Sequence, residues 1–245
     1  LIAGIKPQDE VIIPALTFVA DINVVTMIGA EPVLVDVISL DNWTMDPEDV
    51  KRKITSKTKA VIAVHYAGWA CEMDELQSIC SQNNIWLIED AAHAAGSAYK
   101  NRKCGIIGDI GCFSFFSNKN LSTGEGGMIA SRHEDHIVKA SLIRSHGMTR
   151  STTERYTGKT FSYDVCMPGL NYRIDEVKSA LGLVQLKKHY RNNQKRRELV
   201  HLYIKELASM DELVIPWKNF PDDKKSNGHI FPILLPDTID RDSFM

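Results

Sequence analysis

The stretch Ile85-Trp86-Leu87-Ile88-Glu89-Asp90-Ala91-Ala92-His93-Ala94 is the most informative part of this sequence of 245 residues. An apolar run that ends in two carboxylates is typical of a strand covered on both faces, with polar groups at its carboxyl end. Similar short runs occur at residues 11–13, 32–37, 59–65, 111–115 and 128–130. Helical patterns fall between them, so the sequence predicts an α/β fold with a mostly parallel central sheet flanked by helices.

Five helices are predicted, at residues 18–28, from 46 onward, 73–82, 134–145 and 175–207. We expect a large domain over residues 1–186, followed by a connecting helix and the start of a small C-terminal α+β domain over 187–245. The chain begins at Leu1 in what resembles the tail of a helix and ends at Met245 without a closing element. We therefore expect a piece of a longer protein, lacking the first part of the large domain and most of the small one.

Composition excludes several classes of function. The formal net charge of −2 gives no bulk field for nucleic acid or an anionic membrane, and no apolar run has the length needed to cross a bilayer. The five cysteines form no Cys-x-x-Cys pair, which argues against a zinc ribbon or a disulfide framework. We expect reduced thiols in a cytoplasmic protein with no metal site, and we interpret the basic residues between 187 and 197 as a solvated or interdomain helix face.

A second stretch carries the main candidate for chemistry. It reads Phe113-Ser114-Phe115-Phe116-Ser117-Asn118-Lys119-Asn120-Leu121-Ser122-Thr123-Gly124-Glu125-Gly126-Gly127. Lys119 could form a Schiff base, and Asp90 could keep a pyridine nitrogen protonated; pyridoxal 5'-phosphate (PLP) needs both groups. The alternatives are an exposed loop lysine and an aspartate that caps the next helix.

Other polar groups are candidates for the same site. His93 follows Asp90 by three residues and could contact the oxygen on the cofactor ring, or could simply be a partly buried histidine. Ser114 and the glycines at 124–127 suggest a phosphate site, although the glycines also suit a plain turn. Ligands of open α/β sheets bind beyond the carboxyl ends of the strands, so we expect His65, Asp90 and Ser114 to face one crevice. No P-loop or Rossmann glycine motif is present.

Taken together, the sequence resembles the DegT/StrS sugar-nucleotide aminotransferases, PLP enzymes of the aspartate-aminotransferase (type I) fold. The resemblance rests on stretches that occur in the family's order from Asp9 to Leu186. These are residues 9–18, 29–36, 64–68, 89–94, 113–127 and Gly169-Leu170-Asn171-Tyr172-Arg173. The resemblance implies the PLP-binding large domain of this fold.

The resemblance also implies a role for each matching position. Lys119 would be the Schiff-base lysine and proton shuttle, Asp90 the partner of the pyridinium, and His93 the contact to the ring oxygen. Ser114 would bind the cofactor phosphate, and the aromatic ring of Phe18 would stack on the cofactor ring. Asn171, with Arg173 close by, would contact the cofactor phosphate of a neighbouring subunit. His65 and Glu125 would contact the substrate. The role of Asn171 implies a homodimer with shared active sites.

The function that the resemblance implies is PLP-dependent transamination of a nucleotide-linked keto-sugar, expected at C4, with an amino acid donor such as glutamate. The amino sugar would supply a surface polysaccharide or a related product. One alternative is a PLP-dependent sugar dehydratase or deoxygenase, although Lys119 disfavours the version with histidine in place of the lysine. Another is a non-catalytic regulatory or sugar-binding member of the family.

Overall fold

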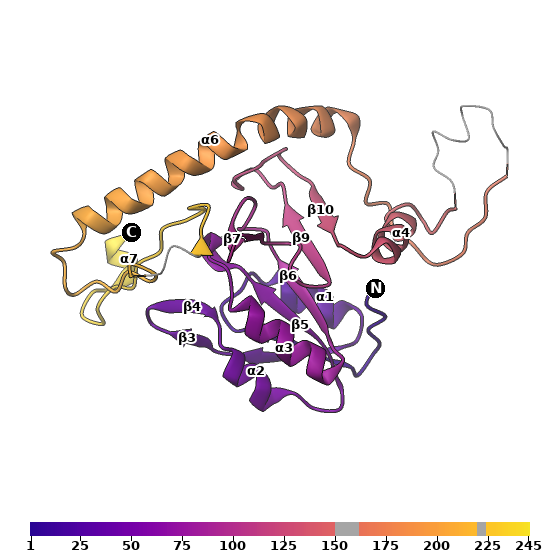
Figure 1. Ribbon diagram of the computed structural model, residues 1–245, viewed down its shortest axis with the longest axis horizontal. Coiled ribbons are helices and arrows are strands. Elements are labelled where there is room, and N and C mark those ends of the chain that lie inside the picture. Colours follow the sequence, from indigo (N-terminus) through magenta and orange to yellow (C-terminus); the bar gives the residue numbers. More distant parts are fainter. Residues whose placement is uncertain (150–161, 220–223) are drawn as a thin grey trace.

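A six-stranded sheet forms the centre of the structure, a computed structural model that describes residues 1–149, 162–219 and 224–245. The strands are β1 (Glu10–Pro14), β2 (Glu31–Val35), β5 (Thr58–Val64), β6 (Trp86–Asp90), β9 (Ile110–Ser114) and β10 (Gly127–Ala130). Their order is β10-β9-β6-β5-β1-β2, and only β10 is antiparallel to its neighbour (Figure 1). The predicted mostly parallel sheet is therefore confirmed.

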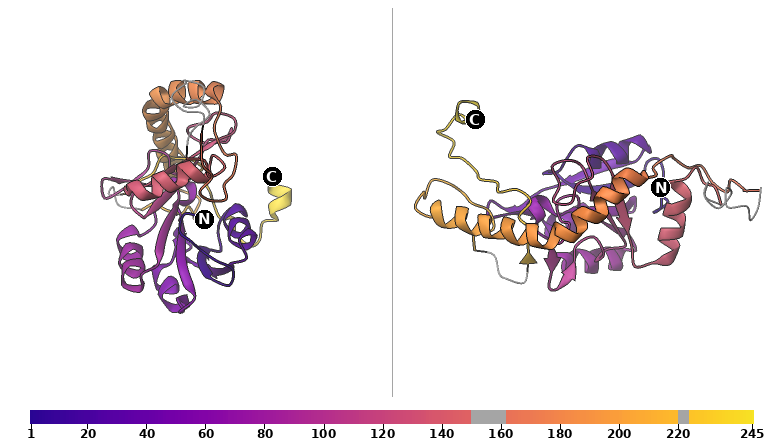
Figure 2. Two further views of the ribbon diagram at one scale, coloured as in Figure 1. Left: turned by 90° about the vertical axis from the view of Figure 1, so that its right-hand side faces the viewer. Right: turned by 90° about the horizontal axis from the view of Figure 1, so that it is seen from above.

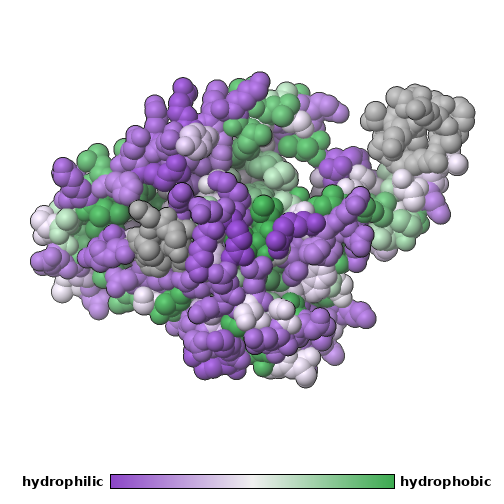
Figure 3. All heavy atoms as spheres, in the orientation of Figure 1, coloured by the Kyte–Doolittle hydropathy of each residue, from purple (hydrophilic) through white to green (hydrophobic). Residues whose placement is uncertain are grey.

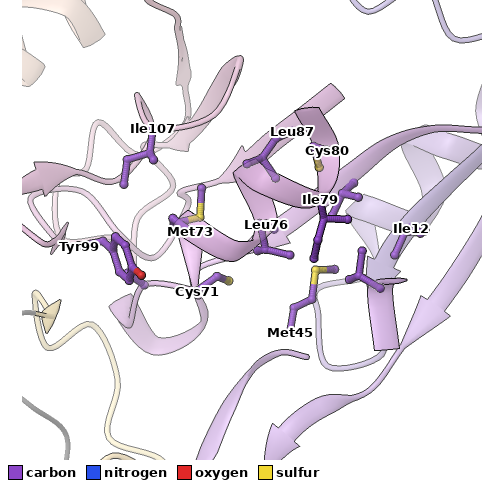
Figure 4. Close-up of a cluster of buried hydrophobic side chains, with 14 of the residues drawn as sticks. Ile12, Met45, Cys71, Met73, Leu76, Ile79, Cys80, Leu87, Tyr99 and Ile107 are labelled. Carbon is purple, nitrogen blue, oxygen red and sulfur yellow. The ribbon is translucent and has the colours of Figure 1, made fainter. Parts of the chain in front are cut away.

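Successive side chains of the inner strands point to opposite faces of the sheet, and both faces are buried. Ile12 and Val61 pack on one face with α2 (Pro47–Lys53) and α3 (Met73–Asn83), as Figure 4 shows for Ile12 and the α3 side chains. Val11 and Ile62 pack on the other face, beneath α1 (Ala20–Met27). Figure 2 shows helices on both sides of the sheet, so the nearly continuous apolar runs have a direct structural cause.

Two further predicted helices are confirmed, α4 (Glu134–Ile143) and α6 (Glu176–Glu206). The short α7 (Arg241–Phe244) and the 3-10 turn η1 (Tyr66–Gly68) were not predicted from the sequence. The Asp46 side chain accepts the N–H of Glu48 at the start of α2, and Asp175 accepts the N–H of Lys178 at the start of α6. These caps satisfy backbone donors that the first helical turn leaves free.

Short strands that the sequence analysis did not identify complete the fold. β3 (Val37–Ser39) and β4 (Asn42–Met45) form a hairpin beside α2. β7 (Ala98–Tyr99) pairs with both β8 (Arg102–Lys103) and β11 (Lys224–Lys225). The β7–β11 pair brings the C-terminal part of the chain back to the region that follows β6.

Helix α6 crosses above the carboxyl ends of the strands (Figures 1 and 2). It is largely exposed: Asn193 is its one fully buried residue, while Val177 and Tyr190 are more than 70% exposed. Hydrophobic residues in Figure 3 are visible along its upper edge, among purple polar ones. Within the described ranges, no helix has both the length and the apolar character needed to cross a membrane. The division into a large and a small domain stays a prediction.

Candidate active site

Asp90 ends β6, and the sheet register places it between Val64 of β5 and Cys112 of β9. Its Oδ1 accepts the N–H of Ala92 at 2.8 Å. The next residues form turns, with the N–H of Ala94 donating to the carbonyl of Ala91 at 2.9 Å. Asp90 thus closes a tight turn and caps no regular helix, which corrects the alternative interpretation from the sequence.

Lys119 lies in the loop between β9 and β10, where it is half-buried. Burial lowers the pKa of the Lys119 amine, and the charge of Asp90 opposes this only in part. Because the deprotonated amine is the nucleophile, the lowered pKa increases its reactivity near neutral pH. The interaction with Asp90 also places the two predicted residues in one site, although 29 positions separate them in the sequence.

The ring of His93 lies near that of Tyr66, with 6.0 Å between the two centroids. Burial, with the nearby charge of Lys119, lowers the pKa of His93 to about 4, so the imidazole is neutral at physiological pH. Its Nδ1 atom is buried and has no hydrogen-bond partner among the residues that the structure describes. A buried polar atom without a partner carries a free-energy cost that a bound ligand removes.

These groups fit PLP. Asp90 supplies an anion for a protonated pyridine nitrogen, Lys119 supplies an amine, and Nδ1 of His93 lacks the partner that a ring oxygen would provide. Ser114 ends β9, and its hydroxyl accepts the N–H of Phe116 at a long 3.3 Å. The hydroxyl therefore remains available to a phosphate.

The structure adds residues from the C-terminal segment that the sequence analysis missed. Asn227 is fully buried and donates to the carbonyl oxygens of His93 at 2.8 Å and Ala95 at 2.9 Å. The ring of His229 lies 4.2 Å from that of His93, and its Nδ1 is 2.9 Å from Oδ1 of Asn120. Burial, helped by His93 and nearby cations, lowers the pKa of His229 to about 3. The compact run Ser226-Asn227-Gly228-His229 before an apolar stretch was the one available sequence signal.

His65 does not face the crevice, which corrects the prediction that it meets the substrate. The side chain is completely buried, and its Nε2 lies 2.8 Å from Oε2 of Glu89. Its Nδ1 accepts the N–H of Cys71 at 3.2 Å. Both ring nitrogens are therefore occupied inside the protein.

The other predicted residues lie at the surface of the chain. Phe18 is 72% exposed just before α1, and Asn171 pairs with Ser145 in an isolated bridge. Arg173 and Glu125 are also exposed. Their predicted contacts to cofactor, substrate or a second subunit stay predictions.

A cavity of about 1360 Å³ lies beneath α6, next to the turn that carries His93. Its lining includes Ala95, Gly96, Phe113 and Trp217, whereas Lys119 and Asp90 are absent from the lining. The cavity is partly open and adjoins the candidate site without containing its chemistry. We therefore identify the site from its convergent polar groups and not from cavity size.

Comparisons with known proteins identify the family of the chain. The profile of the DegT/DnrJ/EryC1/StrS aminotransferase family matches residues 1–245. GDP-perosamine synthase of Vibrio cholerae is 37% identical over 225 residues, which cover 92% of this chain and 56% of the synthase.

Two solved structures are similar in fold. The aminotransferase TlmJ of Streptoalloteichus hindustanus has a TM-score of 0.89 at 28% identity, covering 99% of this chain and 63% of TlmJ. Helicobacter pylori PseC, an aminotransferase involved in the biosynthesis of pseudoaminic acid, has a TM-score of 0.85 at 32% identity, covering 94% and 59%. The chain spans 56 to 61% of the length of three curated relatives that it matches.

Proposed function

Because the chain belongs to the DegT/DnrJ/EryC1/StrS aminotransferase family, we propose that its protein transfers an amino group from an amino acid to a nucleotide-linked keto-sugar with PLP. The observation that carries the proposal is the convergence of Lys119, Asp90 and His93 at the carboxyl ends of β6 and β9. PLP, when bound, supplies an electron sink for the carbanion formed at the amino-bearing carbon.

The protein groups have separable tasks in this proposal. Asp90 would hold a proton on the pyridine nitrogen, because it supplies a carboxylate at the end of β6 in the same site as Lys119. Lys119 binds the cofactor covalently and moves protons at its Nζ atom, for which its lowered pKa is suited. Neutral His93 orients the ring through a hydrogen bond from Nδ1, the atom that is otherwise unpaired.

The relatives support the class of substrate. The curated relatives include GDP-perosamine synthases, and PseC is described as an aminotransferase involved in the biosynthesis of pseudoaminic acid. The resemblance in the sequence adds a keto group at C4 and glutamate as the donor. A surface polysaccharide is the proposed destination, in line with the spore coat polysaccharide biosynthesis protein SpsC among the relatives.

A homodimer is part of the proposal. Phe18 and Met27 at the two ends of α1 are 72% and 83% exposed, which is unusual for large apolar side chains. Asn171 lies in an exposed segment, and in the proposed dimer it contacts the cofactor phosphate in the neighbouring subunit. Each subunit would then complete the site of the other.

Borohydride reduction after incubation with PLP, read by peptide mass spectrometry, tests the cofactor assignment. We expect a phosphopyridoxyl adduct on Lys119 and its loss in Lys119→Ala. Incubation with ¹⁵N-glutamate and candidate keto-sugar nucleotides then tests the reaction. Label in the sugar supports transamination; an unlabelled deoxygenated sugar would support the dehydratase alternative, and absence of any adduct in folded protein would contradict a PLP enzyme.

A further inference from the structure

The side chain of Asn193 in α6 is buried, with 2% of the residue exposed, and it joins two loops of the candidate site. Its Nδ2 atom donates to the carbonyl oxygen of Ala95, in the turn that follows Asp90, at 3.0 Å. Its Oδ1 atom accepts from Nδ2 of Asn120, the residue directly after Lys119, at 2.9 Å. One side chain of α6 therefore bridges the turn after β6 and the loop that carries the candidate lysine.

The amide of Asn120 has a single orientation. Besides its bond to Asn193, its Nδ2 atom donates to the carbonyl oxygen of Asn227 at 3.1 Å, and its Oδ1 atom lies 2.9 Å from Nδ1 of His229. A carbonyl oxygen can only accept, so the NH₂ group of Asn120 faces Asn227 and its oxygen faces His229. Neutral His229 therefore carries its proton on Nδ1 and donates it to Asn120.

The amide of Asn193 is fixed in the same way. Its NH₂ group faces the carbonyl oxygen of Ala95, and Nε2 of His189 lies 3.1 Å from the same nitrogen. The amides of Asn120 and Asn193 thus each use both N–H groups and the oxygen within the protein. Such a network specifies one arrangement of the segments that it joins, because any other arrangement leaves a donor or acceptor unpaired.

The backbone of the turn after β6 permits this close approach of α6. Gly96 has a φ of +86°, and a Cβ atom there would lie 2.6 Å from Nδ2 of Asn193 and 2.7 Å from the ring of His189. Any other residue would strain the backbone and displace both side chains. Glycine at this position therefore lets the Asn193 amide reach the turn.

We propose that Asn120 and Asn193 are a pair of positioning residues, whose hydrogen bond sets the distance between Lys119 and the turn after β6. The inference rests on the proposed use of PLP, whose aldehyde must meet Lys119 while that turn holds its ring. The pair acts through the backbone next to Lys119. The N–H of Lys119 itself donates to the carbonyl of Phe116 at 3.0 Å, within the same loop, so Asn120 connects the loop to the rest of the site.

A positioning role is distinguishable from a purely structural one. Lys119 joins PLP when its Nζ atom attacks the aldehyde carbon and one water molecule leaves, so the rate of this step depends on the distance that the pair sets. Pyridoxamine phosphate has the same ring and phosphate with an amine in place of the aldehyde, and it binds without a bond to Lys119. A general loss of structure would impair both ligands, whereas a displaced Lys119 would slow only the formation of the bond.

The test measures the rate at which PLP forms the borohydride-trapped adduct at Lys119, and the affinity for pyridoxamine phosphate. It compares the wild-type protein with Asn120→Ala, Asn193→Ala and the double variant. Each single substitution should slow adduct formation about 10- to 100-fold and change the affinity for pyridoxamine phosphate less than about twofold. The double variant should be no slower than the slower single variant, because the two residues act through one shared bond.

Gln194→Ala is the matched control. This exposed amide is the next residue of α6, and its Nε2 atom donates to the hydroxyl of Tyr190, so the variant should change neither measurement. Equal losses of adduct rate and of affinity for pyridoxamine phosphate, or an unchanged adduct rate, would overturn the positioning pair and leave the proposed function intact.

Effects that multiply in the double variant would also overturn the pair, since they would show two independent contacts. Absence of an adduct in the wild-type protein would remove the proposed function and the pair with it. Asn120→Ser, which keeps a small polar side chain, provides the same comparison should the alanine variant fail to fold.

Discussion

Nε2 of His65 lies 2.8 Å from Oε2 of Glu89, and both side chains are completely buried. The N–H of Cys71 donates to the other ring nitrogen, so the imidazole carries its single proton on Nε2 and donates it to the carboxylate. Three backbone N–H groups also donate to Glu89 at 2.6 to 2.7 Å, from Gly105, Ile107 and Gly108. The pair fixes the strand end that presents Asp90.

Replacing Glu89 by Gln should destabilise the protein by about 3 kcal/mol, because an amide NH₂ would then face N–H donors in a buried site. Burial raises the pKa of Glu89, but the hydrogen bonds from His65, Gly105 and Gly108 outweigh it and lower the pKa below 4.5. The stabilisation is therefore present at neutral pH and is lost as the pH falls below about 4.5. Denaturant unfolding at pH 7 and pH 4 checks this, with exposed Glu75→Gln as a control expected within about 0.5 kcal/mol.

The strands were predictable because each is a short apolar run that can be recognised from neighbouring residues alone. The polar residues that end β6 and β9 directly follow such runs, so they could be recognised in the same way. The burial of His65 was not predictable. It depends on the parallel register that places Ala63 beside Glu89, a pairing between residues 26 positions apart. The raised pKa of Asp21 was not predictable either, because an acid in a first helical turn normally stabilises the helix dipole and its burial is not visible in the sequence.

Asp21 stands in the first turn of α1, and in the absence of cofactor Asp21→Asn should stabilise the protein more at pH 8 than at pH 5 and little below pH 3.8. The pKa of Asp21 is about 7 in the folded chain and 3.8 as its ordinary value, so wild-type folding takes up a proton between these values. The free-energy cost of keeping Asp21 buried in its ionised form therefore grows as the pH rises and is complete above pH 7, where it lowers the stability by at most about 4 kcal/mol. Thermal unfolding of the variant and the wild-type protein at pH 8 and pH 5 measures this difference, and an equal change in Tm at both would contradict the raised pKa of Asp21.

His93 and His229 should remain neutral from pH 5.5 to 9. Burial lowers their pKa values to about 4 and about 3. The unfolded chain protonates its histidines near 6.5, so both residues lower the stability of the fold as the pH falls below that value. Histidine NMR spectra of the wild-type protein and of each His→Gln variant would identify the two resonances, and a titration midpoint above 6 would refute the prediction.

Asn227→Ala should loosen the C-terminal segment from the turn that carries His93. The variant removes the side-chain donor to the carbonyl oxygen of His93 and one of the donors to that of Ala95, which keeps the Asn193 side chain, at a cost of about 2 kcal/mol. We expect faster hydrogen exchange across residues 224–230 and weaker PLP binding. The exposed Asn23→Ala should change neither, and unaltered exchange in Asn227→Ala would mean that the segment is held by its other contacts.

Asp90→Asn tests the electrostatic role that the whole site implies. The amide preserves the shape of the side chain and can still accept the N–H of Ala92, so the turn after β6 should persist. It removes the negative charge, and the pyridine nitrogen loses the anion that keeps it protonated. We expect the rate of the half-reaction with glutamate to fall about 10²- to 10³-fold, equivalent to about 3 to 4 kcal/mol.

The adduct at Lys119 should still form, since the amine is unchanged. Loss of the adduct together with the rate would assign Asp90 to the architecture of the site, whereas a near-normal rate with the adduct intact would remove it from the chemistry.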